Sequence, residues 1–212
     1  MRHSLSAIRT NYQLRNLCIS DFSSNPIESF RAWLDEAIEF PCLEPTAMVL
    51  STVSSAGRPS GRVVLLKEME DDGSFVFFTN YASRKGSELA CNNWASLTFF
   101  WSEIERQVRI GGKVERIARA ASEQYFYSRP FDSQIAAIIS PQSQLIPNRL
   151  FLDARFQELK QESSAVLCPE HWGGYRLIPD EIEFWQGGAN RLHDRILFEC
   201  RNGQWFKCRL SP

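Results

Sequence analysis

Apolar residues recur along this chain with two periods, one typical of helices and the other of strands. After Asn25-Pro26, the segment IESFRAWLDEAIEF has apolar residues at helical spacing, with the proline in the first turn. These apolar residues are Ile27, Phe30, Trp33, Leu34 and Ile38. The pattern predicts a helix that packs one face against the rest of the fold.

Short apolar runs separated by turn residues predict strands. The runs AMVLSTV (47–53) and GRVVLL (61–66) flank the turn SSAGRPS, which is typical of a β-hairpin. The same pattern continues in SFVFFTN, ASLTFFW and ERQVRIGGKVERI, and it returns in YRLIPDEIEFWQGG, RLHDRILFEC and QWFKCRLSP. Strands at this regular spacing predict an antiparallel barrel or sandwich.

Three further helices are predicted between the strands. Ser83 before RKGSELACNN and Ser122 before EQYFYS both resemble N-caps, and RLFLDARFQELKQE carries charge pairs at i, i+4. Pro130 should interrupt a helix that continues past the second of these segments. We therefore expect an α+β protein, mainly antiparallel β, with residues 1–25 as a flexible N-terminal arm and residues 26–212 as a single domain.

Composition narrows the functional classes. No apolar run approaches the ~20 residues that a membrane span needs. The polar first residues lack the apolar stretch of a signal peptide, so we expect a cytoplasmic protein with no membrane segment. A formal net charge of −1 gives no general attraction for nucleic acid. Six scattered cysteines and three histidines predict neither a disulfide framework nor a metal site.

One group of basic residues has the pattern of a phosphate site. In FTNYASRK a predicted strand ends, Ser83 caps a helix, and Arg84 and Lys85 occupy the first turn, where the helix dipole favours an anion. The alternative is a plain N-cap followed by solvated basic residues. Upstream, Arg62 and Lys67 lie five residues apart, so on a regular strand they would face opposite sides and serve different ligands.

A second group combines a phenol, a guanidinium and a hydroxyl. Tyr125, Arg129 and Ser133 follow one another at i, i+4 spacing, and together they suit a phosphate ester. The alternative is a packed tyrosine beside an ordinary surface arginine.

A third group lies in QGGANRLHDRI (186–196). If this segment is a strand, Arg191, His193 and Arg195 share one face. The alternative is a basic edge strand that discourages aggregation. The chain contains no G-x-G-x-x-G and no P-loop motif, which argues against a dinucleotide-binding fold or an NTPase.

Longer motifs extend over nearly the whole chain, from about Arg9 to Pro212. They are RVVLLK (62–67), FTNYASRKGSELA (78–90), ERQVRIGGKVERI (105–117), YFYSRPFDSQI (125–135), PQSQLI (141–146), HWGGYRLIPDEIEFWQGGANRLHDRI (171–196) and the terminal CRLSP. In this order and spacing the chain resembles the pyridoxine/pyridoxamine 5′-phosphate oxidase family, and SRPxDSQ with EFWQGxxxRLHDR is the most specific combination.

The resemblance implies a fold, a cofactor and a reaction. The fold would be an FMN-binding split barrel with surrounding helices, in a homodimer with FMN at the subunit interface. The reaction would be the oxidation of pyridoxamine 5′-phosphate and pyridoxine 5′-phosphate to pyridoxal 5′-phosphate. O2 would be the electron acceptor and H2O2 a product. The partners would be these small molecules, with no nucleic acid, membrane or metal.

The resemblance also implies roles for the residues at matching positions. FMN would be bound by Arg62, Val63, Val64, Leu65, Leu66, Lys67, Phe78, Thr79, Arg84, Lys85, Gln107, Gln142, Ser143, Trp185 and Arg195. The substrate would be bound by Lys67, Tyr125, Arg129, Ser133, Arg191, His193, Arg9 and Tyr12. Arg191 and His193 would be the catalytic residues over the pyridine ring, and Arg9 and Tyr12 would belong to an arm that closes on the substrate.

Two other functions stay open. A noncatalytic flavin- or pyridoxal-phosphate-binding protein on the same barrel would bind ligand without releasing peroxide. A related flavin reductase would need a nicotinamide cofactor. The presence of both Arg191 and His193 disfavours these alternatives.

Overall fold

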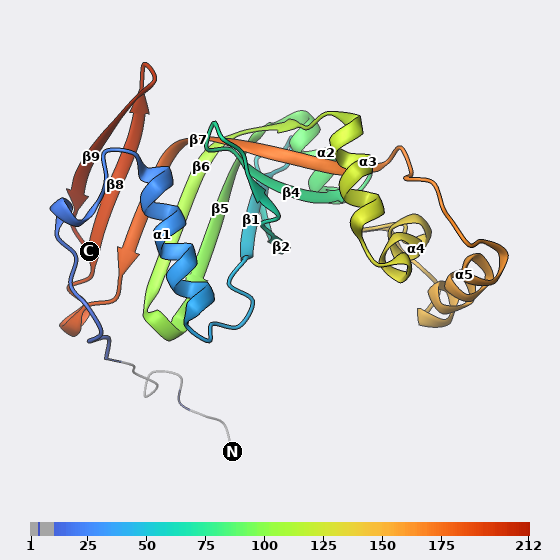
Figure 1. Cartoon of the computed structure of the whole chain (residues 1–212), viewed down its shortest axis with the longest axis horizontal. Helices are drawn as coiled ribbons and strands as arrows, with labels where there is room; N and C mark the ends of the chain where they lie inside the picture. The colour runs from blue at the N-terminus through green and yellow to red at the C-terminus, as the bar shows by residue number, and fades with distance from the viewer. Residues whose placement is uncertain (1–3, 5–10) are drawn as a thin grey trace. The chain divides into compact units, whose positions relative to one another are not determined.

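The computed structural model describes residues 4 and 11–212, and Figure 1 shows the chain path. The helices are α1 (Pro26–Glu39), α2 (Arg84–Cys91), α3 (Arg119–Ser128), α4 (Phe131–Ile139) and α5 (Arg149–Glu162), with short 3-10 turns η2 (Ile19–Asp21), η3 (Ser102–Ile104) and η4 (Ala189–Arg191). The strands are β1 (Ala47–Val53), β2 (Pro59–Leu65), β3 (Glu68–Met69), β4 (Phe75–Asn80), β5 (Trp94–Trp101), β6 (Arg106–Arg116), β7 (Trp172–Gln186), β8 (Asp194–Arg201) and β9 (Gln204–Leu210).

The strands form one sheet with the hydrogen-bonded order β2-β1-β5-β6-β7-β4-β3, and β8 joins β7 to β9. The pairs β3–β4, β4–β7, β7–β8 and β8–β9 are antiparallel. The predicted α+β class, mainly antiparallel β, is confirmed. No helix in residues 11–212 has the length and apolar character needed to cross a membrane.

The chain divides into two compact units. The first comprises the described residues up to 49 together with 96–111 and 179–212, and the second comprises residues 50–95 and 112–178. The single domain expected over residues 26–212 stays a prediction, as does the flexibility of residues 1–25.

In the first unit, α1 packs its apolar stripe as the sequence predicts. Asn25 caps the helix, because its side-chain oxygen accepts a hydrogen bond from the Ile27 N–H at 3.0 Å. Phe30 packs against Phe99 and Trp33 against Phe184, both with ring centroids 5.0 Å apart. Ile38 is the exception, since it is 56% exposed. Ala37 completes the buried stripe in its place.

The second unit begins with the predicted hairpin of β1 and β2. The Ser54 N–H donates to the Arg58 carbonyl at 3.0 Å, and Gly57 supplies the positive φ of 74° that the turn requires. Strand β4 pairs with β3 on one side and with the first part of β7 on the other. Phe126, Cys168 and Trp172 form a buried cluster beside these strands.

Two helix starts test the predicted N-caps. Ser83 caps α2 as predicted, because its Oγ accepts from the Gly86 N–H. The N-cap prediction for Ser122 is wrong, since α3 begins at Arg119 and Ser122 lies buried inside it. The Ser122 hydroxyl accepts instead from the Gly174 N–H of β7 at 3.0 Å. Ser122 therefore makes a tertiary contact with a strand, although its local sequence resembles a helix N-cap.

The predicted interruption at Pro130 is confirmed. Helix α3 ends at Ser128 and α4 begins at Phe131, with Pro130 in the N-cap position. Tyr125 and Ser133 therefore belong to two different helices rather than to one face of a single helix.

The strand predicted in RLHDRILFEC forms, but only Asp194 and Arg195 of its first five residues lie in it. Strand β8 begins only at Asp194, and Ala189–Arg191 form a 3-10 turn in which Asn190 and Arg191 have φ values of 57° and 63°. The chain turns back sharply here, since the Leu192 N–H donates to the Ala189 carbonyl at 3.0 Å. The prediction that Arg191, His193 and Arg195 share one strand face is therefore wrong.

Candidate functional site

A cavity of about 620 Å³ lies in the second unit, and many of the predicted ligand-binding residues line it. They are Arg62, Val63, Val64, Leu65, Lys67, Phe78, Thr79, Lys85, Tyr125, Arg129, Ser133 and Gln142. The lining includes four cationic side chains and no carboxylate. Such a cavity favours an anionic ligand of small-molecule size.

The sequence did not point to several other lining residues, namely Asn80, Pro130, Ala136, Ala137, Ser140 and Trp172. Trp172 is buried in the aromatic cluster, where its ring stacks 5.5 Å from Phe78. It lies in the family motif that begins at His171, but no ligand-binding role was predicted for it. It reaches the cavity because β7 pairs with β4, with Trp172 opposite Asn80.

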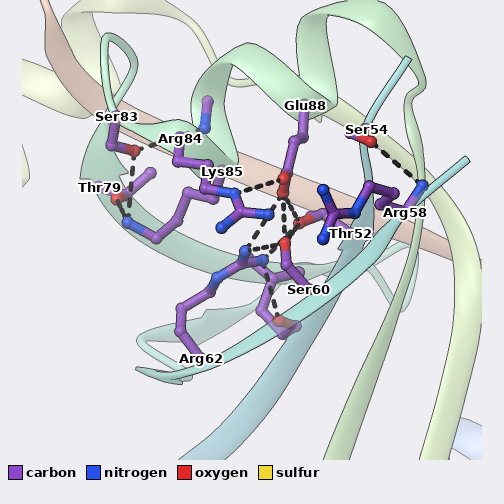
Figure 2. A network of polar contacts seen from close by, with 12 residues as sticks. Thr52, Ser54, Arg58, Ser60, Arg62, Thr79, Ser83, Arg84, Lys85 and Glu88 are labelled. Carbon is purple, nitrogen blue, oxygen red and sulfur yellow. Dashed lines mark hydrogen bonds and ion pairs between the residues drawn. The ribbon is translucent and has the colours of Figure 1, made fainter. Parts of the chain in front are cut away.

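Lys85 is the buried cation of this cavity. Its Nζ donates to Gln142 Oε1 at 2.6 Å, Thr79 Oγ1 at 3.1 Å and Ser83 Oγ at 3.3 Å, and Figure 2 shows it directed toward Thr79. Among the described residues no carboxylate pairs with it. Burial, followed by the charge of Arg62, lowers the pKa of Lys85 from 10.5 to about 8. An anion bound here would reverse that effect.

Arg84, its neighbour in the same helical turn, behaves differently. Its Nε donates to Glu88 Oε1 at 2.9 Å, and its side chain is 62% exposed. It does not line the cavity. The first turn of α2 therefore supplies one cation to the cavity rather than the two that the sequence suggested.

Arg62 and Lys67 line the same cavity, so the expectation that they serve opposite sides is not met. Strand β2 ends at Leu65, and the Lys67 N–H donates to the Val76 carbonyl at 2.9 Å. The strand alternation on which the expectation rested therefore does not extend to Lys67.

Arg129 lies at the corner between α3 and α4, where its guanidinium sits 4.9 Å from the centre of the Trp172 ring. Its Nη1 is buried and has no hydrogen-bond partner among the described residues. Burial lowers the pKa of Arg129. A buried N–H without a partner is costly, so this group suits a ligand that brings an acceptor.

Tyr125 completes this side of the cavity. Its ring stacks on Phe78 with centroids 3.9 Å apart, and burial raises the pKa of its hydroxyl. The phenol is therefore a neutral donor at physiological pH. Ser133 lies in the first turn of α4 and lines the cavity beside Arg129.

The remaining predicted residues of the second unit do not line this cavity. Leu66 is buried in the core, and Ser143 is exposed with a φ of 70°. Arg9 lies outside the described residues.

The first unit holds a separate aromatic group made by Tyr12, Trp185 and His193. The His193 ring lies 4.8 Å from Trp185 and 5.9 Å from Tyr12. Its Nδ1 accepts a hydrogen bond from the Gly188 N–H at 3.1 Å. A neutral His193 therefore carries its proton on Nε2 and presents a donor there.

Arg195 of the same unit is held by a carboxylate. Its Nε and Nη2 donate to the two oxygens of Glu183 at 2.9 and 3.0 Å, and Nη1 donates to the Ser211 carbonyl at 2.9 Å. The hydrogen bonds to Glu183 raise the pKa of Arg195. Arg191 is exposed, and Gln107 is half-buried in β6.

Within the described ranges, no group of three or more His, Cys, Asp and Glu side chains could hold a metal ion.

Comparison with known proteins decides the family. Residues 34–163 match the pyridoxamine 5′-phosphate oxidase family, and residues 172–212 match the pyridoxine 5′-phosphate oxidase C-terminal dimerisation region. The chain belongs to the pyridoxamine 5′-phosphate oxidase family. The predicted resemblance is thereby confirmed.

Curated relatives of the same family match this chain over its full length or nearly so. The chain is 49% identical to a pyridoxine/pyridoxamine 5′-phosphate oxidase from Cyanothece sp., covering 100% of both chains. It is 50% identical to the protein of the same name from Neisseria meningitidis, covering 98% of this chain and 99% of the relative.

Solved structures agree as well. PhzG from Burkholderia lata 383, solved in complex with tetrahydrophenazine-1-carboxylic acid, has a TM-score of 0.87 at 33% identity, over 91% of this chain and 95% of PhzG. A pyridoxamine 5′-phosphate oxidase-related, FMN-binding protein from Nostoc punctiforme has a TM-score of 0.70 at 16% identity, over 87% and 96% of the two chains. The second likeness concerns the fold alone, and it confirms the predicted split barrel.

Proposed function

We propose that this chain is an FMN-dependent oxidase that converts pyridoxamine 5′-phosphate and pyridoxine 5′-phosphate to pyridoxal 5′-phosphate, with O2 as acceptor and H2O2 as a product. The observation that carries the proposal is the cation-lined cavity, which has no carboxylate in its lining. Lys67, Lys85 and Arg129 have no carboxylate partner among the described residues. FMN and both substrates are phosphate monoesters, which match these cations.

The residues around Lys85 fit the phosphate of FMN. Lys85 and Arg62 supply positive charge, while Thr79 and Gln142 contribute a hydroxyl and an amide. Val63, which is 66% exposed, offers an apolar surface next to them. We assign the other predicted flavin contacts, listed above from the family resemblance, to the same cofactor.

The residues around Arg129 fit the phosphate of the substrate. Arg129 offers the unpartnered Nη1, and Lys67, Tyr125 and Ser133 add an ammonium and two hydroxyls. Charge-assisted bonds from a planar guanidinium give both affinity and orientation. An anchor at the phosphate fixes the position of the pyridine ring. Orientation of this kind can lower the activation free energy of a reaction by on the order of 7–11 kcal/mol.

When bound, FMN supplies the acceptor for the hydride that leaves the C4′ carbon of the substrate, and O2 afterwards receives the electrons. Arg191 and His193 are proposed to contact the pyridine ring and keep C4′ in place. Because Gly188 occupies its Nδ1, a neutral His193 donates a hydrogen bond from Nε2 rather than removing a proton there. With the amine substrate, water then hydrolyses the imine product to the aldehyde and ammonia.

We further propose that the active form is a homodimer with FMN at the subunit interface. The match of residues 172–212 to the family's dimerisation region supports this. Trp185, Arg191, His193 and Arg195 all lie in that region, so their proposed contacts with flavin and substrate would be made in the dimer.

The proposal is tested by measuring peroxide and pyridoxal 5′-phosphate formed from pyridoxamine 5′-phosphate in air, with and without added FMN. We expect both products in equal amounts and only when FMN is present. FMN-loaded protein that binds the substrate without forming peroxide would indicate the noncatalytic alternative. Flavin reduction driven by a nicotinamide cofactor would indicate the reductase.

A further inference from the structure

Glu88 is a buried carboxylate behind the cation cluster, and the proposed function does not yet use it. Its side chain is 5% exposed. Its Oε2 accepts from Thr52 Oγ1 at 2.5 Å, Ser60 Oγ at 2.6 Å and Arg62 Nη2 at 3.2 Å. Its Oε1 accepts from Arg84 Nε at 2.9 Å. Figure 2 shows these groups converging on the carboxylate.

Glu88 remains ionised in this position. Burial alone would raise its pKa, but hydrogen bonds from Ser60, Thr52, Arg84 and Arg62 outweigh burial and hold the pKa at about 2. The carboxylate therefore keeps its charge at any pH at which the protein would be assayed.

The network fixes the orientation of the Arg62 guanidinium. Nη1 donates to the Leu50 carbonyl at 3.1 Å and also to Thr52 Oγ1, while Nη2 donates to Ser60 Oγ at 2.5 Å and to Glu88. An arginine has five N–H donors. The donor left without a contact among the described residues is the Nε–H, on a side chain that lines the cavity.

Two effects of Glu88 on an anion in the cavity oppose each other. Its negative charge repels the anion, which weakens binding. Its hydrogen bonds hold Arg62 in one orientation, which reduces the entropy lost when Arg62 binds the anion. The two effects predict opposite results when the charge is removed.

We propose that Glu88 is a positioning residue that orients Arg62 for the phosphate of FMN, and that this outweighs its repulsion of the phosphate. The inference rests on the proposed function, since it assigns Arg62 and Lys85 to the cofactor. It adds a residue that contacts neither FMN nor substrate and acts through Arg62.

The test compares FMN and riboflavin binding to apoprotein with Glu88 and with Glu88→Gln, using quenching of flavin fluorescence. Riboflavin lacks the phosphate and so reports the rest of the site. We expect Glu88→Gln to weaken FMN binding by roughly tenfold, the low end for one charge-assisted hydrogen bond, and to leave riboflavin binding unchanged. FMN binding that is unchanged or tighter would overturn the inference.

Three further variants complete the test. Glu88→Asp keeps the charge on a shorter side chain and should recover part of the loss. In an Arg62→Ala background, Glu88→Gln should weaken FMN binding no further, because the residue that it positions is absent. Asp153→Asn is the matched control, because it removes an exposed i, i+4 partner of Arg149 on α5.

Ser60→Ala keeps the inference testable should Glu88→Gln fail to fold. Ser60 bridges Glu88 and Arg62, so its loss should weaken FMN binding several-fold, again with riboflavin unaffected. FMN binding to Ser60→Ala as tight as to the unchanged chain would overturn the inference. If the unchanged chain binds riboflavin as tightly as FMN, the assignment of the phosphate site itself is wrong, and the proposed function fails with it.

Discussion

Carboxylates balance the charge of Arg106 and Arg195 in the first unit, whereas no carboxylate among the described residues pairs with Lys85 or Arg129 in the second. In the first unit, Arg106 donates to Glu36 at 2.6 Å and Arg195 forms a two-point pair with Glu183. In the second unit, Lys85 is held by neutral groups and Arg129 has a buried Nη1 with no partner among the described residues.

The difference separates structural cations from candidate ligand-binding ones. A buried ion pair is satisfied internally, and removing one partner leaves the other charge uncompensated. A buried cation without a carboxylate is unsatisfied until an anion arrives. Substitution of an ion-paired cation should therefore lower the free energy of unfolding. Substitution of a cation without a carboxylate partner should instead weaken ligand binding.

The largest expected effect is on stability, from Arg106→Ala. This change removes one of the two cationic partners of Glu36, the other being Arg15. It also removes a hydrogen bond to Gln186 at 3.0 Å and a guanidinium stacked 4.1 Å from the Trp33 ring. We expect the free energy of unfolding to fall by about 3 kcal/mol, the low end for a buried pair, because Glu36 is 34% exposed. Urea denaturation of the apoprotein measures it, and a loss below about 1 kcal/mol would remove Arg106 from the structural group.

Arg129→Ala should give the opposite pattern. We expect the Kd for pyridoxamine 5′-phosphate to rise roughly tenfold to a hundredfold, because a charge-assisted contact is lost. FMN affinity and the free energy of unfolding should change little, since Arg129 Nη1 has no internal partner among the described residues. Calorimetric titration with both ligands measures the two affinities. Equal losses for FMN and substrate would show that the phosphates are assigned to the wrong groups.

The lowered pKa of Lys85 predicts a pH dependence for FMN binding. Below a pH of about 8 the ammonium is charged and FMN binds fully, whereas above it FMN affinity should fall by up to about tenfold per pH unit. Apoprotein stability should move the other way and gain between pH 8 and 10.5, because the cost of burying the charge is relieved.

Fluorescence titrations with FMN from pH 7 to 10 test the prediction, and riboflavin corrects for ionisation of the flavin itself. Lys85→Arg keeps its charge throughout this range and should remove the pH dependence. A pH dependence that persists in Lys85→Arg would assign it to another group.

The smallest effect is expected at an exposed pair. Arg149 and Asp153 on α5 are 83% and 47% exposed and lie 2.9 Å apart. Asp153→Asn should change the free energy of unfolding by less than about 0.5 kcal/mol and leave both ligand affinities unchanged. A larger change, measured by the same urea denaturation, would mean that an exposed ion pair also stabilises the fold and that pairing alone does not mark Arg106 as structural.

The sequence predicted those elements whose local pattern and tertiary role agree. Helix α1, the hairpin of β1 and β2, the cap at Ser83 and the break at Pro130 follow from spacing and from proline and serine chemistry. The start of α3 was missed because the Ser122 hydroxyl serves a strand. The strand predicted from Arg191 begins only at Asp194, because positive φ values at Asn190 and Arg191 turn the chain first.

The site was predicted in part for similar reasons. The motifs name Lys85, Arg129 and Ser133, and the structure places them around one cavity. Trp172 lies in a family motif, but no ligand-binding role was predicted for it, since strand pairing brings it to the cavity. Glu88 does carry a local signal, because it lies four residues after Arg84. Only the fold shows that Thr52 and Ser60 donate hydrogen bonds to the same carboxylate.

The close approach at Gly86 limits how this site can change by mutation. A Cβ at this position would lie 2.1 Å from the carbonyl oxygen of Tyr81, a backbone atom that cannot move aside alone. A library that randomises residues 84–88 should therefore return many side chains at exposed position 87 but only glycine at position 86. New specificity in this protein would have to arise from residues that project into the cavity, because the loop and helix that carry Lys85 tolerate so little variation where they touch.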